Sequence, residues 1–187
     1  MSEFLTLPGD LPAPADDGAC AHLAGLPLPS MALPGTDGLN TDLSALPERS
    51  VLYIYPRTAR PGVPMPEDWD LIPGARGCTP QSCAFRDHHA ELRSAGARVF
   101  GLSVQNTTEQ REAATRLHLP FPLLSDAGRA LCSALRLPTF QAGGETLLRR
   151  VTLILQGGLV EHVFYPVFPP DRNASKVLAW LADHPEP

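Results

Sequence analysis

The stretch Cys78-Thr-Pro-Gln-Ser-Cys-Ala-Phe-Arg-Asp87 places two cysteines five positions apart at the start of a predicted helix. Thr79 is a good N-cap residue, and Pro80 suits the first helical position, where its missing N–H would have no partner anyway. The pattern continues to a glycine, a typical helix end, and therefore predicts a helix over Thr79–Ala95. Cys78 would lie just outside the helix N-terminus, where unpaired N–H groups and the positive end of the dipole favour an anion. We therefore interpret Cys78 as a nucleophilic thiolate.

The composition indicates a globular protein that does not bind nucleic acid. A chain of 187 residues can bury a core without disulfides or metals, and 43% of its residues are hydrophobic. The net charge is −5 and there is no basic stripe, which argues against nucleic-acid binding. Four cysteines do not make a secreted disulfide scaffold at this length, and we find neither a leader nor an apolar run that could span a bilayer. We expect a cytoplasmic protein, without a membrane partner, whose thiols do chemistry.

The first fifty residues are rich in proline and glycine and contain only short apolar pieces. We expect an N-terminal extension over residues 1–25 and a single domain over residues 26–187. The segments Leu26–Pro34 and Gly35–Gly38 resemble extended stretches and turns that lie against a core. Cys20 lies in this part of the chain, and we interpret it as a spectator thiol.

The central part of the chain alternates strands and helices. Val51–Tyr55 is a continuous apolar run, typical of a strand buried on both faces. After Pro56, the proline-rich loop Arg57–Gly77 has about twenty residues, a length at which loops are usually functional or disordered. The downstream pattern predicts strand Arg98–Val104, a helix from Asn106 or Thr107 to about Leu117, strand Pro122–Ser125, a helix from N-cap Asp126 to about Leu135, strands Arg149–Leu155 and Leu159–Tyr165, and a helix from about Asn173 to Ala182.

This order of elements indicates an α/β protein with a mixed central sheet and helices on both faces. Reactive groups in such folds lie beyond the carboxyl ends of the parallel strands. Strand Val51–Tyr55 carries the chain toward the Cys78 region at such an end. The predicted position of Cys78 therefore agrees with its predicted chemistry.

The sequence resembles the peroxiredoxins of the Q or bacterioferritin-comigratory-protein type. The resemblance is carried by Val51–Pro56, Gly77–Asp87, Phe100–Ser103, Leu123–Asp126 and Arg150–Ile154, and the Cys-x4-Cys-x-Phe-Arg-Asp pattern is its most specific part. It implies a thioredoxin-like fold and thiol-dependent reduction of hydrogen peroxide and organic hydroperoxides without a cofactor. It also implies thioredoxin or a similar dithiol as the reductant, and a monomer or weak homodimer.

The resemblance implies a role for four residues. It assigns the peroxidatic cysteine to Cys78, the resolving cysteine to Cys83, the active-site arginine to Arg150 and the shielding proline to Pro56. Helix N–H groups and Arg150 would stabilise the alkoxide that leaves when the thiolate attacks a peroxide, and the resulting sulfenic acid would condense with Cys83. Because side chains alternate along a strand, only one of Arg149 and Arg150 can reach the pocket, and the resemblance favours Arg150.

One position departs from the family pattern Pro-x3-Thr-x2-Cys, since Ala75 stands three residues before Cys78. If the family pattern is aligned from Pro56 without a gap, the position of its cysteine falls on Val63. The family pattern that follows the cysteine nevertheless matches the residues that follow Cys78. We interpret the difference as an insertion of about fifteen residues before Cys78. Thr58 and Thr79 are the candidates to supply the missing hydroxyl to the substrate, and the sequence does not choose between them.

Two other classes of function are weighed against this interpretation. A thiol–disulfide relay or redox sensor of thioredoxin fold, without significant peroxidase turnover, is disfavoured because the two-residue spacing of thioredoxin motifs is absent. A zinc-binding structural module would need Cys78, Cys83 and one of His88 and His89. Adjacent histidines point to different helix faces, so too few ligands converge, and we expect no metal site. The preferred hydroperoxide and the roles of Arg57–Gly77 and Cys132 stay open.

Overall fold

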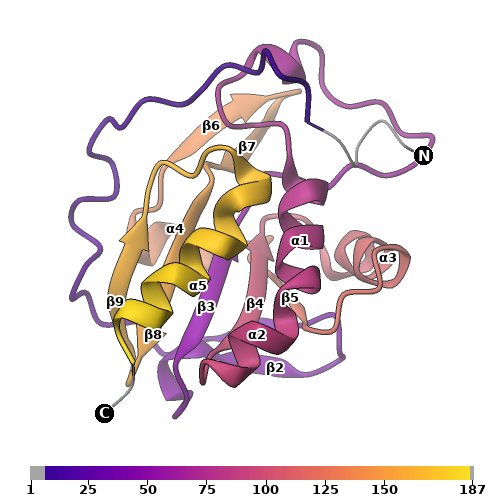
Figure 1. Ribbon diagram of the computed structural model, residues 1–187. Coiled ribbons are helices and arrows are strands. Elements are labelled where there is room, and N and C mark those ends of the chain that lie inside the picture. Colours follow the sequence, from indigo (N-terminus) through magenta and orange to yellow (C-terminus); the bar gives the residue numbers. More distant parts are fainter. Residues whose placement is uncertain (1–6, 186–187) are drawn as a thin grey trace.

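Five strands form the central sheet of the computed structural model, which describes residues 7–185 (Figure 1). Their spatial order is β5-β4-β3-β8-β9, in which β3, β4 and β5 are parallel and β8 and β9 are antiparallel to their neighbours. The strands are β3 (Ser50–Ile54), β4 (Arg98–Ser103), β5 (Leu123–Ser125), β8 (Val151–Gln156) and β9 (Leu159–Phe164). The predicted mixed sheet is confirmed.

The helices are α1 (Cys78–Asp87), α2 (His89–Ser94), α3 (Thr107–Arg116), α4 (Ala130–Leu135) and α5 (Asn173–Asp183). Helices α1, α2 and α5 lie in front of the sheet in Figure 1, and α4 lies behind it. Alternation along β3 divides the core accordingly: Val51 and Tyr53 pack under α1 and α5, whereas Leu52 and Ile54 pack toward α4. All five side chains of β3 are buried, which explains its continuous apolar run.

The N-terminal segment covers the α4 face of the sheet. It contains the two-stranded sheet β1 (Ala32–Pro34) and β2 (Asn40–Asp42) and the short helix η1 (Leu43–Ala45). Leu23 is buried in the core, and the Gly25 N–H donates to the Val160 carbonyl of β9 at 2.8 Å. Contacts with the core thus begin before residue 26. The division into residues 1–25 and 26–187 stays a prediction, and residues 1–6 lie outside the described part of the chain.

The start of α1 differs from the prediction. The helix begins at Cys78, with Gly77 rather than Thr79 as its N-cap, and a break at His88 separates it from α2. Gly77 has a φ of 108°, and a Cβ at this position would lie 2.3 Å from Cγ of Pro170. The sequence favoured Thr79 because threonine is a common cap. Glycine is favoured at position 77 because a side chain there would clash with Pro170. Pro170 is far from Gly77 in the sequence, so a local sequence pattern does not reveal this contact.

Asp126 was also predicted at the wrong place in its helix. Helix α4 begins at Ala130, behind Arg129 in a left-handed conformation, and not directly after Asp126. The Asp126 carboxylate nevertheless accepts from the N–H groups of Leu131 (3.1 Å) and Cys132 (2.8 Å). Asp126 therefore accepts hydrogen bonds from two N–H groups in the first turn of α4, although it is not the N-cap residue.

A β-hairpin that the sequence did not predict lies beside the Arg57–Gly77 loop. Strands β6 (Thr139–Ala142) and β7 (Glu145–Leu148) pair around the two glycines that were expected only to turn the chain into β8. The loop contains the short helix η2 (Trp69–Leu71), and another short helix, η3 (Pro170–Arg172), precedes α5. Trp69 and Ala75 of the loop form a small core with Ala142 and Leu147 of the hairpin. The loop is thus packed onto the domain.

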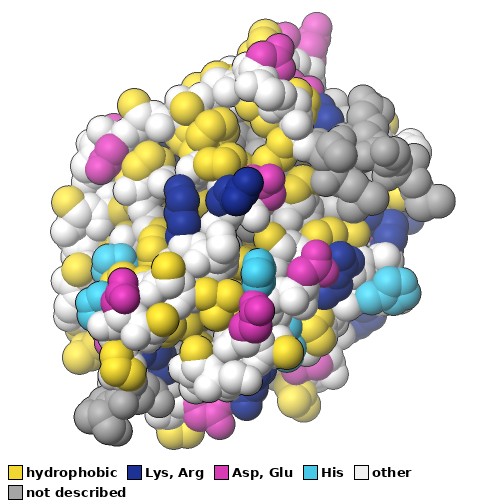
Figure 2. Space-filling view, in the orientation of Figure 1, with side chains coloured by type: hydrophobic (Ala, Val, Ile, Leu, Met, Phe, Trp, Pro, Cys, Tyr) yellow, Lys and Arg dark blue, Asp and Glu magenta, His cyan; other side chains and the backbone are white. Residues whose placement is uncertain are grey.

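Figure 2 shows acidic and basic side chains interspersed over the face that carries α1, α2 and α5. The charge on this face therefore has no single sign. Within residues 7–185, no helix is both long and apolar enough to cross a bilayer.

Gly101 on β4 gives a test of the packing under α1. A Cβ there would lie 2.5 Å from Leu123 and 2.7 Å from the ring of Tyr53, so Gly101→Ala should destabilise the fold by about 1–3 kcal/mol. Gly128→Ala is the matched control, because a Cβ at Gly128 meets nothing within 4 Å. Chemical denaturation of both variants measures the difference, and equal stabilities would contradict this packing.

Candidate active site

Cys78 is held in a buried site at the first turn of α1, where it is 3% exposed. Its Sγ lies 3.2 Å from Nη2 of Arg150, which donates to it, and 3.6 Å from the carbonyl of Ala75. The guanidinium thus places a cationic N–H donor directly beside the sulfur. The structure therefore brings together the predicted nucleophile and the predicted arginine.

Arg150, and not Arg149, reaches Cys78, but neither residue lies in a strand, since β8 begins at Val151 and not at Arg149 as predicted. Arg150 directly precedes β8, in which Ile154 faces α1 and α5. Nη2 of Arg150 also donates to the carbonyls of Gly74, Ala75 and Arg76, at 3.3, 3.1 and 3.3 Å. The Arg149 side chain is 40% exposed and lies 3.9 Å from Asp17.

A buried chain of hydrogen bonds fixes Arg150 from its other side. Nη1 of Arg150 donates to Oε1 of Gln81, whose Nε2 donates to Oδ1 of Asn173 at 2.9 Å. Thr152 donates its hydroxyl to the same Asn173 oxygen at 2.7 Å. All four side chains are buried, so each bond has little competition from water. Sequence reasoning missed Gln81 and Asn173, although Gln81 stands within the quoted cysteine stretch.

A small cavity of about 20 Å³ lies beside Cys78, with room for about one water molecule. It is formed by the start of α1, the loop before it and the N-terminal segment. The residues that line it are Leu7, Arg57, Ala59, Met65, Trp69, Arg76, Gly77, Cys78, Thr79 and Pro80.

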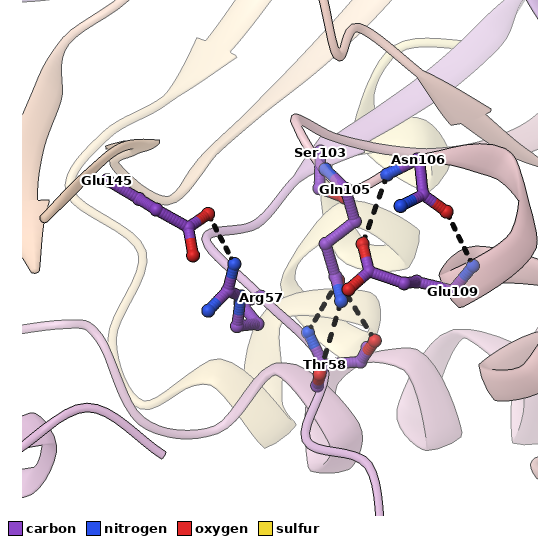
Figure 3. A network of polar contacts seen from close by, with 7 residues as sticks. All are labelled: Arg57, Thr58, Ser103, Gln105, Asn106, Glu109 and Glu145. Carbon is purple, nitrogen blue, oxygen red and sulfur yellow. Dashed lines mark hydrogen bonds and ion pairs between the residues drawn. The ribbon is translucent and has the colours of Figure 1, made fainter. Parts of the chain in front are cut away.

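The two threonine candidates differ in position. Thr79 is buried and lines the cavity beside Cys78. Thr58 lines a neighbouring hollow of about 140 Å³, and both its N–H and its hydroxyl donate to Oε1 of Gln105, at 2.9 and 3.0 Å (Figure 3). The geometry therefore brings Thr79, but not Thr58, to the cavity. Pro56, the predicted shielding residue, is buried directly before Arg57.

The other three thiols lie in different surroundings. Burial raises the pKa of Cys20 to about 12, with the carboxylates of Asp16 and Asp17 adding to the effect. Burial also raises the pKa of Cys83, which is half-buried on α1, and that of Cys132 on α4. All four cysteines are free thiols. In the part of the chain that the structure describes, no three His, Cys, Asp or Glu side chains are grouped to hold a metal ion.

Comparison with known proteins places the chain in a family. The sequence model of the redoxin family matches residues 23–179, which is most of the chain. The chain belongs to the redoxin family. Peroxiredoxin Q of Sedum lineare is 31% identical to this redoxin over 155 residues, which cover 82% of the chain and 74% of the relative. The resemblance to the peroxiredoxins of the Q type is therefore confirmed.

The curated relatives extend beyond the region that this redoxin matches. Peroxiredoxin Q of Oryza sativa subsp. japonica is 31% identical over 159 residues, which cover 84% of the chain but 65% of the rice protein. Both plant relatives are named as chloroplastic. The cytoplasmic location expected for this redoxin stays a prediction.

Solved structures confirm the thioredoxin-like fold of this redoxin. Peroxidoxin BcpB of Mycobacterium tuberculosis superposes with a TM-score of 0.71 at 25% identity, covering 88% of this chain and all of that one. Peroxiredoxin Q of Xanthomonas campestris gives a TM-score of 0.65 at 28% identity, covering 86% of this chain and 98% of that one.

Proposed function

We propose that this chain is a thiol-dependent peroxidase that reduces hydrogen peroxide and organic hydroperoxides. The observation that carries the proposal is the 3.2 Å contact between the buried Sγ of Cys78 and the guanidinium of Arg150. Such a pair holds a nucleophile ready and keeps a cation next to the oxygens of a bound peroxide. Family membership supports the same chemistry.

The proposed first step consumes one hydroperoxide and one thiolate. The Cys78 thiolate attacks the terminal oxygen, so that an S–O bond forms, the O–O bond breaks, and an alkoxide leaves. The sulfur is oxidised by two electrons to sulfenic acid, and the peroxide is reduced to an alcohol, or to water, once the alkoxide takes a proton from solvent. Arg150 and the N–H groups of the first turn of α1 would stabilise the leaving oxygen.

We propose that Cys83 resolves the sulfenic acid, releasing water and forming a Cys78–Cys83 disulfide within one chain. Thioredoxin or a similar dithiol would then reduce this disulfide, and the protein would act as a monomer or weak homodimer. Consumption of hydrogen peroxide by the wild-type chain, coupled to a thioredoxin system, tests the function. A wild-type rate no higher than that of buffer would contradict it.

The distance between the two cysteines predicts that α1 unwinds during the cycle. Residues five apart on a regular helix have Cα atoms about 8–9 Å apart, whereas a disulfide tolerates no more than about 7 Å. We expect peroxide treatment to yield a Cys78–Cys83 linked peptide by mass spectrometry. We also expect the loss of helical circular dichroism and of amide protection from Thr79 to about Phe85.

Unwinding of α1 would break contacts that this helix makes with the sheet. Phe85 is fully buried, and its ring stacks on that of Tyr53 with the ring centroids 4.5 Å apart. The Tyr53 hydroxyl donates a hydrogen bond to Oγ of Ser82 at 3.1 Å. Both contacts would have to break in the oxidised protein. A disulfide from Cys78 to any other thiol, with α1 still protected, would remove Cys83 from the mechanism.

A further inference from the structure

The cavity beside Cys78 contains a cationic side chain that the family pattern does not assign. Arg57 directly follows Pro56 and lines the cavity together with Cys78. Its side chain is 20% exposed, and its Nη2 donates to Glu145 of β7 at 2.5 Å. Figure 3 shows Arg57 turned toward Glu145, whereas its neighbour Thr58 turns toward Gln105. The guanidinium is therefore held in one place by the hairpin.

The Nε–H of Arg57 is a buried donor without an acceptor. It has no hydrogen-bond partner among the described residues. Most buried donors in proteins are paired, and an unpaired N–H on a charged group is especially unfavourable. Nε of Arg150 is also unpaired, but Arg150 does not line the cavity. Arg57 thus lines the cavity and carries a buried donor that has no acceptor among the described residues.

Several other polar groups near Cys78 are already engaged or absent, while Thr79 lines the cavity together with Arg57. Position 75 is an alanine and supplies no hydroxyl, and its carbonyl already accepts from Arg150. The Thr58 hydroxyl donates to Gln105 and lies outside the cavity. The Arg150 guanidinium uses Nη1 on Gln81 and Nη2 on three carbonyls and Sγ.

We propose that Arg57 is a further catalytic residue, whose Nε–H donates a hydrogen bond to the hydroperoxide bound beside Cys78. This inference rests on the proposed peroxidase function. The hydrogen bond strengthens as negative charge develops on the leaving oxygen. Arg57 gives up no proton, because a guanidinium stays charged in proteins, and the alkoxide is protonated by solvent. Glu145 acts as a positioning residue, since it holds the other end of the guanidinium.

The cavity of about 20 Å³ beside Cys78 has room for about one water molecule. Trp69 and Met65 of the inserted loop form part of its wall.

The test compares two reactions of the same thiol in Arg57→Met and Arg57→Lys. We expect the second-order rate constant for Cys78 oxidation by hydrogen peroxide, followed by stopped-flow tryptophan fluorescence, to fall roughly 10- to 100-fold in both variants. Alkylation of Cys78 by iodoacetamide, which needs no donor to a peroxide oxygen, should change far less. Arg57→Lys keeps a cation opposite Glu145 but lacks Nε, so it remains informative if Arg57→Met fails to fold.

Arg60→Met is the matched control, because Arg60 is exposed on the same loop, and its peroxide rate should equal that of wild type. An unchanged peroxide rate in Arg57→Lys, with wild type active, would overturn the inference and leave the peroxidase function standing. An equal loss of peroxide and iodoacetamide reactivity would also overturn it, because Arg57 would then act on the thiolate alone. A wild-type protein that consumes no peroxide would overturn the proposed function itself.

Discussion

Replacing Cys78 with serine should reduce peroxide consumption to the rate of the buffer alone. The proposed reaction needs a sulfur nucleophile, and a serine hydroxyl is neither ionised near neutral pH nor able to form a sulfenic acid. Cys78 is also the thiol that receives a hydrogen bond from a buried guanidinium. The measurement is peroxide consumption coupled to a thioredoxin system, with wild type and Cys78→Ser at equal concentration.

The remaining thiols supply the controls for this result. Cys20 and Cys132 belong to the core on the other side of the sheet from α1, so Cys20→Ser and Cys132→Ser should keep nearly full activity. Burial raises the pKa of Cys20, Cys83 and Cys132, so these three thiols should be alkylated more slowly than Cys78. Full turnover by Cys78→Ser would contradict the proposed function.

The parts of the fold that the sequence predicted depend on local patterns. The apolar run Val51–Tyr55 is fully buried, and its first four residues belong to β3. The hairpin β6–β7 was missed because its stability comes from the loop packed on it, through Trp69 and Ala75 against Leu147. The loop and the hairpin are far apart in the sequence, so no short stretch of sequence contains the residues on both sides of that contact.

The same reason separates the predicted from the unpredicted site residues. Cys78 stands in a pattern that can be read within a few residues, whereas the choice of Arg150 over Arg149 came from the resemblance to the peroxiredoxins. Gln81 bonds Asn173, 92 positions away, and Arg57 bonds Glu145, 88 positions away. Their positions at the site depend on tertiary pairing. Thr79 was predicted both as the helix cap and as a candidate hydroxyl at the site; Gly77 is the cap, and Thr79 does line the cavity.

Replacing Arg150 with methionine should slow the peroxide step by roughly 10- to 1,000-fold, the range expected when a positioned donor to a developing oxyanion is removed. Methionine fills much of the space but supplies no N–H to Sγ of Cys78. It also leaves Gln81 without its Arg150 donor, so circular dichroism should establish that the variant is folded before stopped-flow rates are compared. Arg149→Met is the matched control, because that side chain is 40% exposed and faces Asp17 rather than the thiol, and its rate should stay near that of wild type. A slow Arg149→Met beside an unaffected Arg150→Met would mean that the guanidinium seen at Cys78 does not serve the reaction.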